Sequence, residues 1–158
     1  MRHDRVLNAL TEELRRDGIK HIVDQTVDCC ADSDLRLLRP DLQLRSASGE
    51  ELVVDIKSPV EVAGALDEAA VRNTKHYEGV RRQVARTTGR TCRVMTFVVG
   101  ALGAWWRGNW ATLRACGLGR ASLRRLAKRC CRDAPMASYR LWLNHCGATT
   151  CQKLLDGQ

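Results

Sequence analysis

The sequence predicts a single α/β domain of 158 residues, and two observations carry that prediction. Helix-type and strand-type hydrophobic patterns follow one another in the order helix, three strands, helix, strand and further helices. The hydrophobic fraction of 44% beside 28% charged residues is typical of a globular chain that buries a core. We divide the domain into a core over about residues 1–106 and a basic helical extension over about 107–158.

The first part of the chain is expected to hold one helix and three strands. Residues 2–17 predict a helix, because apolar residues recur at helical spacing and Gly18 is a natural end. Residues 19–28 indicate a strand. Residues 36–45 and 51–57 indicate two more strands, which the turn sequence SASGE joins into a hairpin.

The second part is expected to be mainly helical. Residues 65–87 predict a long helix that Gly89 closes. Residues 92–100 predict an apolar strand that is buried on both faces. Three further helices are expected, over residues 109–116, 120–132 and about 133–147, and Asp133 and Pro135 resemble the cap and first turn of the last one.

The net charge of +8 comes from the end of the chain. Residues 1–106 carry 16 basic and 16 acidic side chains, whereas residues 107–158 carry 10 basic and 2 acidic ones. A basic face of this kind commonly binds nucleic acid, although a solvated surface that keeps the protein soluble is the alternative. The predicted phosphate contacts are Arg124, Arg125, Lys128, Arg129 and Arg132.

The sequence predicts an intracellular protein whose cysteines are free thiols. No apolar run reaches the roughly 18 residues that span a bilayer, and the first residues lack the apolar core of a signal peptide, so we expect no membrane partner. An intracellular chain is not expected to form disulfides from its eight cysteines. Packing as small hydrophobic side chains is favoured over a zinc site, for which the candidate ligands are Cys130, Cys131, His145, Cys146 and Cys151.

The candidate catalytic centre consists of Asp41, Asp55 and Lys57. Strand alternation puts Asp55 and Lys57 on one face, and a hairpin turning about Ser48 puts Asp41 opposite Asp55. Facing residues in such a pair lie about 4.5–5.5 Å apart, where two carboxylates repel each other. A divalent cation between them removes the repulsion, and Mg²⁺ or Mn²⁺ suits these oxygens, with the Ile56 carbonyl as a third ligand.

Lys57 completes a site for phosphodiester hydrolysis. Its ammonium can position an attacking water and stabilise the negative charge that develops on the phosphorus centre. The predicted reaction is metal-assisted hydrolysis by in-line attack. The alternative is an ordinary ion pair between Asp55 and Lys57 on an exposed strand.

These residues match a known motif. RPDL followed by VVDIK fits the PD-(D/E)xK pattern, so the chain resembles the restriction-endonuclease-like nuclease superfamily. Together with RHDRVLNAL, VVDIKSPVE, KHY and TFVVGALGAWWRGNW, it resembles the restriction-like endonuclease domain of site-specific non-LTR retrotransposons, from Arg2 to about Gly147. FVVGALGAW is the most specific part, because generic nucleases of the superfamily do not share it.

The resemblance implies a fold, an activity and partners. The fold is a central mixed sheet flanked by helices. The activity is nicking of a chromosomal, hence nuclear, double-stranded DNA target, which frees a 3′-hydroxyl that primes reverse transcription. The partners are the reverse transcriptase and zinc-binding modules of a larger polyprotein. A structure-specific nuclease like the Holliday-junction resolvases and a non-catalytic DNA-binding module remain as alternatives.

The resemblance also assigns roles. It makes Asp41 and Asp55 metal ligands, and in this family the lysine often lies on the following helix near a tyrosine. Here Lys75 points away from the inward face of that helix, so we favour Lys57 as the catalytic lysine and Tyr77 as an auxiliary residue, with core packing as the alternative for Tyr77.

Two residues of the first predicted helix are further candidates for the site. Glu13 is a candidate additional metal ligand, because some nucleases of the superfamily carry an acidic ligand there; surface solvation is the alternative. His3 lies on the apolar stripe, and a histidine satisfied at the helix end is favoured over one that approaches the active centre.

Overall fold

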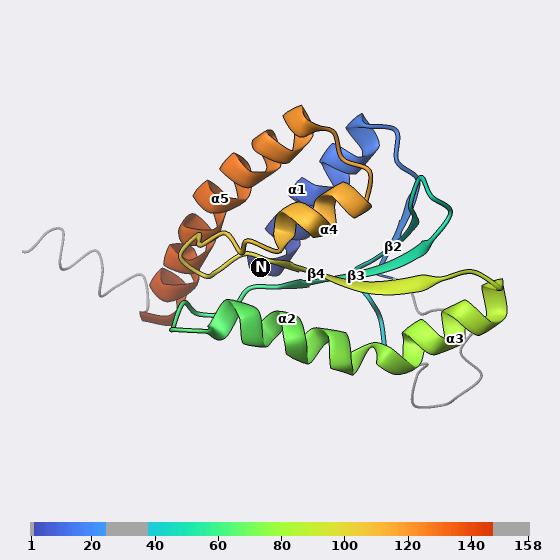
Figure 1. The fold of residues 1–158 in the computed structure, drawn as a ribbon. Helices are drawn as coiled ribbons and strands as arrows, with labels where there is room; N and C mark the ends of the chain where they lie inside the picture. The colour runs from blue at the N-terminus through green and yellow to red at the C-terminus, as the bar shows by residue number, and fades with distance from the viewer. Residues whose placement is uncertain (1, 25–37, 147–158) are drawn as a thin grey trace, which may run out of the picture.

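Four strands form one mixed sheet in the computed structural model, which describes residues 2–24 and 38–146. The strand order is β1-β2-β3-β4, with antiparallel pairing up to β3 and parallel pairing between β3 and β4. Helices cover both faces of this sheet (Figure 1), so the predicted mixed α/β class is confirmed. The strands are β1 (His21–Val23), β2 (Leu42–Arg45), β3 (Glu51–Lys57) and β4 (Cys92–Val98).

The hairpin between β2 and β3 has the register that the sequence predicts. Leu42 pairs with Val54, which centres the hairpin on Ser48, and one further step places Asp41 opposite Asp55. β2 is shorter than the predicted strand, because Pro40 has no backbone N–H to donate to a neighbouring strand.

The first strand is also shorter than predicted. A strand was expected over residues 19–28, and β1 holds three of them. Residues 25–28, the last four of the expected strand, lie outside the described residues. The same holds for residues 36 and 37 at the start of the second predicted strand.

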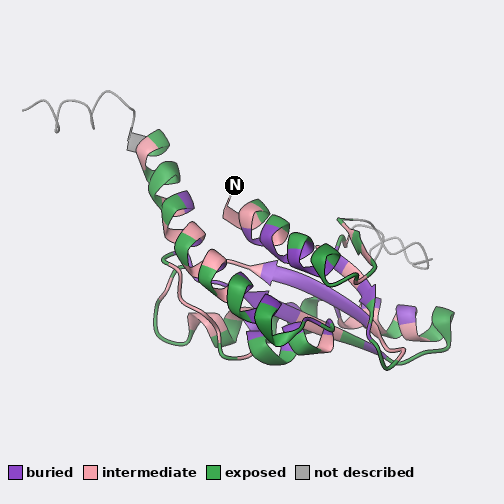
Figure 2. Ribbon diagram, turned by 90° about the horizontal axis from the view of Figure 1, so that it is seen from above, coloured by how far each residue is buried: buried purple, intermediate pink, exposed green. Residues whose placement is uncertain are grey.

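One face of the sheet carries the main core. It is covered by α1 (Arg2–Arg16), α4 (Asn109–Ala115) and α5 (Arg120–Cys146) (Figure 1). The β3 side chains that alternate toward this face are fully buried. The large, fully buried members of the core cluster include Leu10, Leu14, Leu42, Leu52, Val54, Ile56, Phe97, Leu113 and Leu126. Figure 2 shows β3 buried along its length beneath these helices.

The opposite face is covered by two helices rather than the predicted one. α2 (Ala65–His76) and α3 (Glu78–Thr88) meet at Tyr77, whose φ of −95° and ψ of 9° depart from helical values. The break changes the chain direction (Figure 1), so that both helices stay packed against the sheet. Tyr77 is buried there with Val53, Val80 and Val84 in a second, smaller core cluster.

The last helix also differs from the prediction, because one helix stands where two were expected. We expected two helices that divide near Asp133, but α5 is continuous and contains Pro135. Pro135 cannot donate to the Cys131 carbonyl, which the turn at Gly103 approaches closely: a Cβ on Gly103 would lie 2.4 Å from that oxygen. Packing on this turn and on α1 therefore compensates for the missing helical hydrogen bond.

None of the helices within residues 2–24 and 38–146 has the length and apolar character needed to cross a membrane.

Candidate active site

The predicted carboxylates meet at the carboxyl end of β3. Asp41 lies immediately before β2, and its Oδ2 accepts a hydrogen bond of 2.5 Å from the backbone N–H of Ile56. Asp55 lies on β3 with a relative exposure of only 3%. The sheet register therefore holds the two acidic residues side by side, as the hairpin symmetry predicts.

Asp55 is a buried carboxylate with incomplete hydrogen bonding. Its Oδ1 accepts a 3.0 Å hydrogen bond from the Tyr77 hydroxyl, and the Lys57 ammonium forms an ion pair with its Oδ2. Oδ2 is buried and has no partner that meets hydrogen-bond geometry. Burial raises the pKa of Asp55, and the nearby charge of Asp41 adds to this effect, while Lys57 and Tyr77 oppose it.

Tyr77 is buried, and it also contacts the site. Its hydroxyl lies 3.0 Å from Asp55 Oδ1 and 3.1 Å from the Arg39 carbonyl, and its one proton can be donated to either oxygen. Burial and the charge of Asp55 raise the pKa of Tyr77, so the hydroxyl stays protonated and remains a donor. Core packing and an auxiliary role are thus compatible for this residue.

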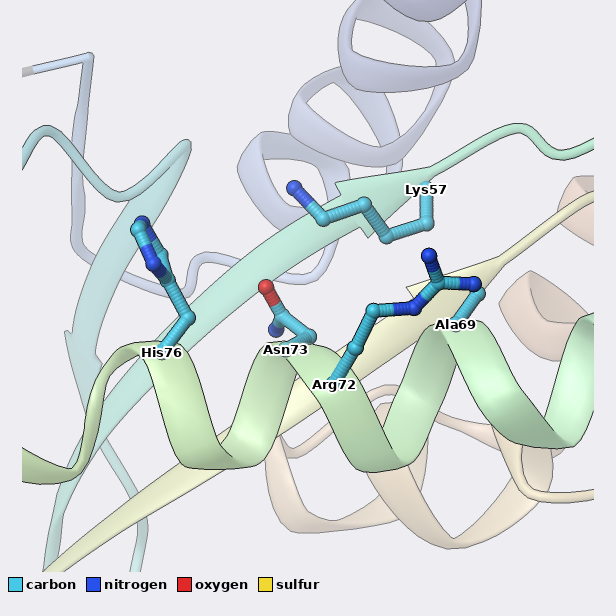
Figure 3. Close-up of a pocket in the computed structure, with 5 residues that line it drawn as sticks. All are labelled: Lys57, Ala69, Arg72, Asn73 and His76. Carbon is cyan, nitrogen blue, oxygen red and sulfur yellow. The ribbon is translucent and has the colours of Figure 1, made fainter.

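A pocket of about 390 Å³ opens on the α2 side of Lys57 (Figure 3). Asn73 forms part of its floor with a relative exposure of 2%, and its amide nitrogen donates to Thr96 Oγ1 at 3.0 Å. The amide oxygen points toward the side of the pocket where Lys57 lies, and it has no hydrogen-bond partner within residues 2–24 and 38–146. The lining residues are Lys57, Ala69, Arg72, Asn73 and His76.

His3 reaches the site, which sequence reasoning ranked as the weaker alternative. Its Nε2 lies 3.0 Å from Asp41 Oδ2, and its Nδ1 lies 3.4 Å from Asp4 Oδ1. The hydrogen bond to Asp41 raises the pKa of His3, although partial burial opposes the shift. The helical stripe indicated that His3 faces inward, but only the packing of α1 on β3 shows that it meets Asp41.

Glu13 is not brought to this centre. It is 4% exposed, and its carboxylate accepts hydrogen bonds from Arg16 at 2.7 Å and Arg125 at 2.8 Å. Ten residues separate it from His3 on α1, about 15 Å along a helix axis. Glu13 therefore does not belong to the site that Asp41 and Asp55 form.

The predicted phosphate contacts on α5 are largely neutralised. Arg125 pairs with Glu13, Arg129 with Glu12, and Arg132 with Asp133 at 2.8 Å. Arg124 and Lys128 are exposed. Neither has an acidic partner in the part of the chain that the structure describes. Three of these five predicted contacts are thus paired with carboxylates from α1 and from α5 itself.

Asp41, Asp55 and the Ile56 carbonyl fit a hard divalent cation. All three are oxygen donors, and Oδ2 of the buried Asp55 already attracts one cationic group, the Lys57 ammonium. Within residues 2–24 and 38–146, no three His, Cys, Asp or Glu side chains gather as a metal cluster. Two carboxylates suffice for Mg²⁺, because this ion commonly completes its shell with water and substrate phosphate.

The described cysteines favour packing as small hydrophobic side chains over a zinc site. Cys130 is 1% exposed in the main core, and burial raises the pKa of its thiol to about 12. Cys131 is half-buried, and both are free thiols. Cys151 and the side chain of Cys146 lie outside the described residues, so the zinc alternative stays a prediction.

No known protein-family model matches the chain, and no curated protein sequence matches it significantly. Functional assignment therefore depends on the geometry of the site and on the motif that its residues form.

Proposed function

We propose that the protein is a Mg²⁺- or Mn²⁺-dependent DNA endonuclease with a restriction-endonuclease-like core. The observation that carries the proposal is the juxtaposition of Asp41, immediately before β2, with Asp55 on β3, where Lys57 lies beside Asp55 on the same face of the strand. A buried carboxylate whose pKa stays raised even beside an ammonium is costly to a fold, which favours a functional reason for it.

The residues of the chain would divide the chemistry among them. A divalent cation held by Asp41, Asp55 and the Ile56 carbonyl would supply a Lewis acid for the phosphodiester. The Ile56 N–H orients Asp41, and the Tyr77 hydroxyl orients Asp55. Lys57 donates hydrogen bonds to the attacking water or to a phosphate oxygen, whose negative charge grows during in-line attack.

The biological role that we propose follows from the sequence motif. The domain would nick a nuclear double-stranded DNA target, leaving a 5′-phosphate and a 3′-hydroxyl. The 3′-hydroxyl would prime reverse transcription by a partner reverse transcriptase module, with zinc-binding modules of the same polyprotein contributing to target choice. The support for this role is the resemblance of RPDL, VVDIKSPVE and TFVVGALGAWWRGNW to the retrotransposon endonuclease domains.

Nicking of supercoiled plasmid tests the proposal. The purified chain is incubated with Mg²⁺, Mn²⁺ or EDTA, beside Asp55→Ala and a matched control, Glu51→Gln, at the opposite end of the same strand. We expect metal-dependent nicking by the wild type and the control and none by Asp55→Ala. Nicking that survives Asp55→Ala would show that the site is wrongly assigned.

The substrate form separates the proposal from its alternatives. Linear duplex, fork and four-way junction DNA are compared at equal concentration, and the nick is extended with a DNA polymerase to detect a free 3′-hydroxyl. A strong preference for the junction would favour a resolvase-like nuclease. DNA binding without cleavage under either metal would favour a non-catalytic DNA-binding module.

A further inference from the structure

Three pockets adjoin one another around the end of β3. The pocket on the α2 side shares Lys57 with a second pocket of about 410 Å³, which Arg2, His3, Ile56, Ser58 and Leu141 also line. The second shares Arg2 and Leu141 with a third, of about 170 Å³, between α1 and the last turns of α5. The third is lined by Arg2, Arg5, Ala137, Arg140, Leu141 and Asn144. We name these three adjoining pockets together the β3-end groove.

The β3-end groove is lined by cations and contains no acidic lining residue among the described residues. Arg2 donates to two neutral acceptors, Ser138 Oγ and the Ser58 carbonyl, each at 2.9 Å. Arg72 has only a distant, solvent-exposed ion pair of 3.8 Å with Glu68. Lys57 and His3 pair with the site carboxylates Asp55 and Asp41. The basic lining residues are Lys57, Arg72 and His76 on one side, and Arg2, His3, Arg5 and Arg140 on the other.

The two halves of α5 differ in this respect. In the first half, Arg125, Arg129 and Arg132 are paired with carboxylates, and Arg124 and Lys128 are the exposed exceptions named above. In the second half, Arg140 is exposed and has no acidic partner in the described part of the chain. It lies where α5 passes the end of β3, because Ser138 on the same turn receives a hydrogen bond from Arg2 and donates one to the Ala101 carbonyl at 2.6 Å.

We propose that the β3-end groove carries the phosphodiester backbone of the DNA, across the end of β3 rather than along the first half of α5. The phosphate under attack would lie at Lys57, next to the two carboxylates. Phosphates on one side of it would contact Arg72 and His76, and those on the other side Arg2, Arg5 and Arg140. This inference rests on the proposed function, because the groove is assigned to DNA as the substrate of that site.

The groove suits a polyanion on physical grounds. Phosphate binding gains from cations that have no competing carboxylate, since a matched cation must first give up its partner. Lys57 joins two pockets, so one strand in the groove would pass directly over the candidate catalytic residue. The unsatisfied Asn73 oxygen adds a hydrogen-bond acceptor for a base or a sugar-bound water on the α2 side.

Two arginine substitutions on α5, one at the groove and one away from it as the control, test the proposal. Arg140→Ala and Arg124→Ala each remove one exposed arginine without an acidic partner from the same helix, so they change the net charge equally. Arg72→Ala tests the α2 side, and Lys128→Ala is its control. All variants are made in an Asp55→Asn background, so that binding is measured without cleavage, with a fluorescent DNA duplex followed by anisotropy over a series of salt concentrations.

We expect Arg140→Ala and Arg72→Ala each to weaken binding about fivefold or more and to lower the slope of log affinity against log salt by about 0.9. Arg124→Ala and Lys128→Ala should stay within about twofold of the parent, with the same slope. Circular dichroism and thermal unfolding confirm that each variant is folded.

The results separate failure of the groove from failure of the function. Equal or larger effects at Arg124 and Lys128 overturn the groove, even when the wild type nicks DNA. Loss of binding at Arg72 and Arg140 without any nicking by the wild type keeps the groove and rejects the nuclease. Absence of DNA binding, or tighter binding of an RNA duplex of the same sequence, overturns the assignment to DNA.

Discussion

Glu13 and Asp55 are both buried carboxylates, and they are satisfied in different ways. Glu13 is 4% exposed and accepts hydrogen bonds from two guanidinium groups, those of Arg16 and Arg125. Asp55 is 3% exposed, forms an ion pair with the single ammonium of Lys57 and accepts a hydrogen bond from the Tyr77 hydroxyl. A fully matched carboxylate stabilises the packing of helices, whereas an incompletely matched one retains capacity to bind a ligand.

Asp55→Asn is expected to have the largest effect and to separate activity from stability. Metal-dependent nicking should fall on the order of a thousandfold, because the carboxylate that we propose as a metal ligand loses its charge. At neutral pH the variant should be more stable by about 1 kcal/mol, since a buried and incompletely satisfied charge is removed. Plasmid nicking and urea unfolding measure the two effects, and a less stable variant would contradict this view of Asp55.

Glu13→Gln should show the opposite pattern. Two arginines lose their shared carboxylate, so we expect the free energy of unfolding to fall by about 2 kcal/mol. Nicking per folded molecule should be unchanged, because Glu13 lies outside the candidate site. Glu12→Gln is the control, since its exposed pair with Arg129 should contribute nothing measurable to unfolding by urea. Loss of nicking in folded Glu13→Gln would return Glu13 to the site.

Tyr77→Phe probes the neutral partner of Asp55. The variant loses the one proton that the hydroxyl shares between Asp55 and the Arg39 carbonyl, so it should lose about 1 kcal/mol of stability. Nicking should fall about tenfold, because Asp55 is less well oriented. Tyr139→Phe, which alters an exposed tyrosine on α5, serves as the control in both assays. Unchanged nicking would assign Tyr77 to core packing alone.

The smallest expected effect is the pH dependence of stability, which should have opposite signs at two carboxylates. Hydrogen bonds from the Gly119 N–H and the Ser122 hydroxyl lower the pKa of Asp17, so its contribution is present above its usual pKa and is lost as pH falls through the lowered value. The pKa of Asp55 is raised, so stability is lost instead as pH rises from the usual aspartate value through the raised one.

Urea unfolding between pH 3 and 7 of the wild type, Asp17→Asn and Asp55→Asn measures these two slopes. Relative to the wild type, Asp17→Asn should lose less stability in acid, and Asp55→Asn should gain most at neutral pH. Parallel curves for all three proteins would show that neither carboxylate has a shifted pKa.

The hairpin and its carboxylates were predictable because they depend on local geometry. A turn centred on Ser48 sets the pairing, and strand alternation then sets which residues share a face. The break at Tyr77 and the continuity of α5 through Pro135 were not predictable, since each depends on distant partners. Tyr77 is held by Arg39 and Asp55, and the turn at Gly103 packs against the carbonyl that Pro135 leaves unbonded.

The sequence by itself determined the fold class, the hairpin register and the side-by-side placement of Asp41 and Asp55, because periodicity and turn position act over a few residues. Only the tertiary structure decided which distant side chains join them: His3 does and Glu13 does not. It also decided which cations are matched by carboxylates. Such pairings depend on how α1 and α5 pack together and on the sheet, a long-range outcome that no short sequence pattern specifies.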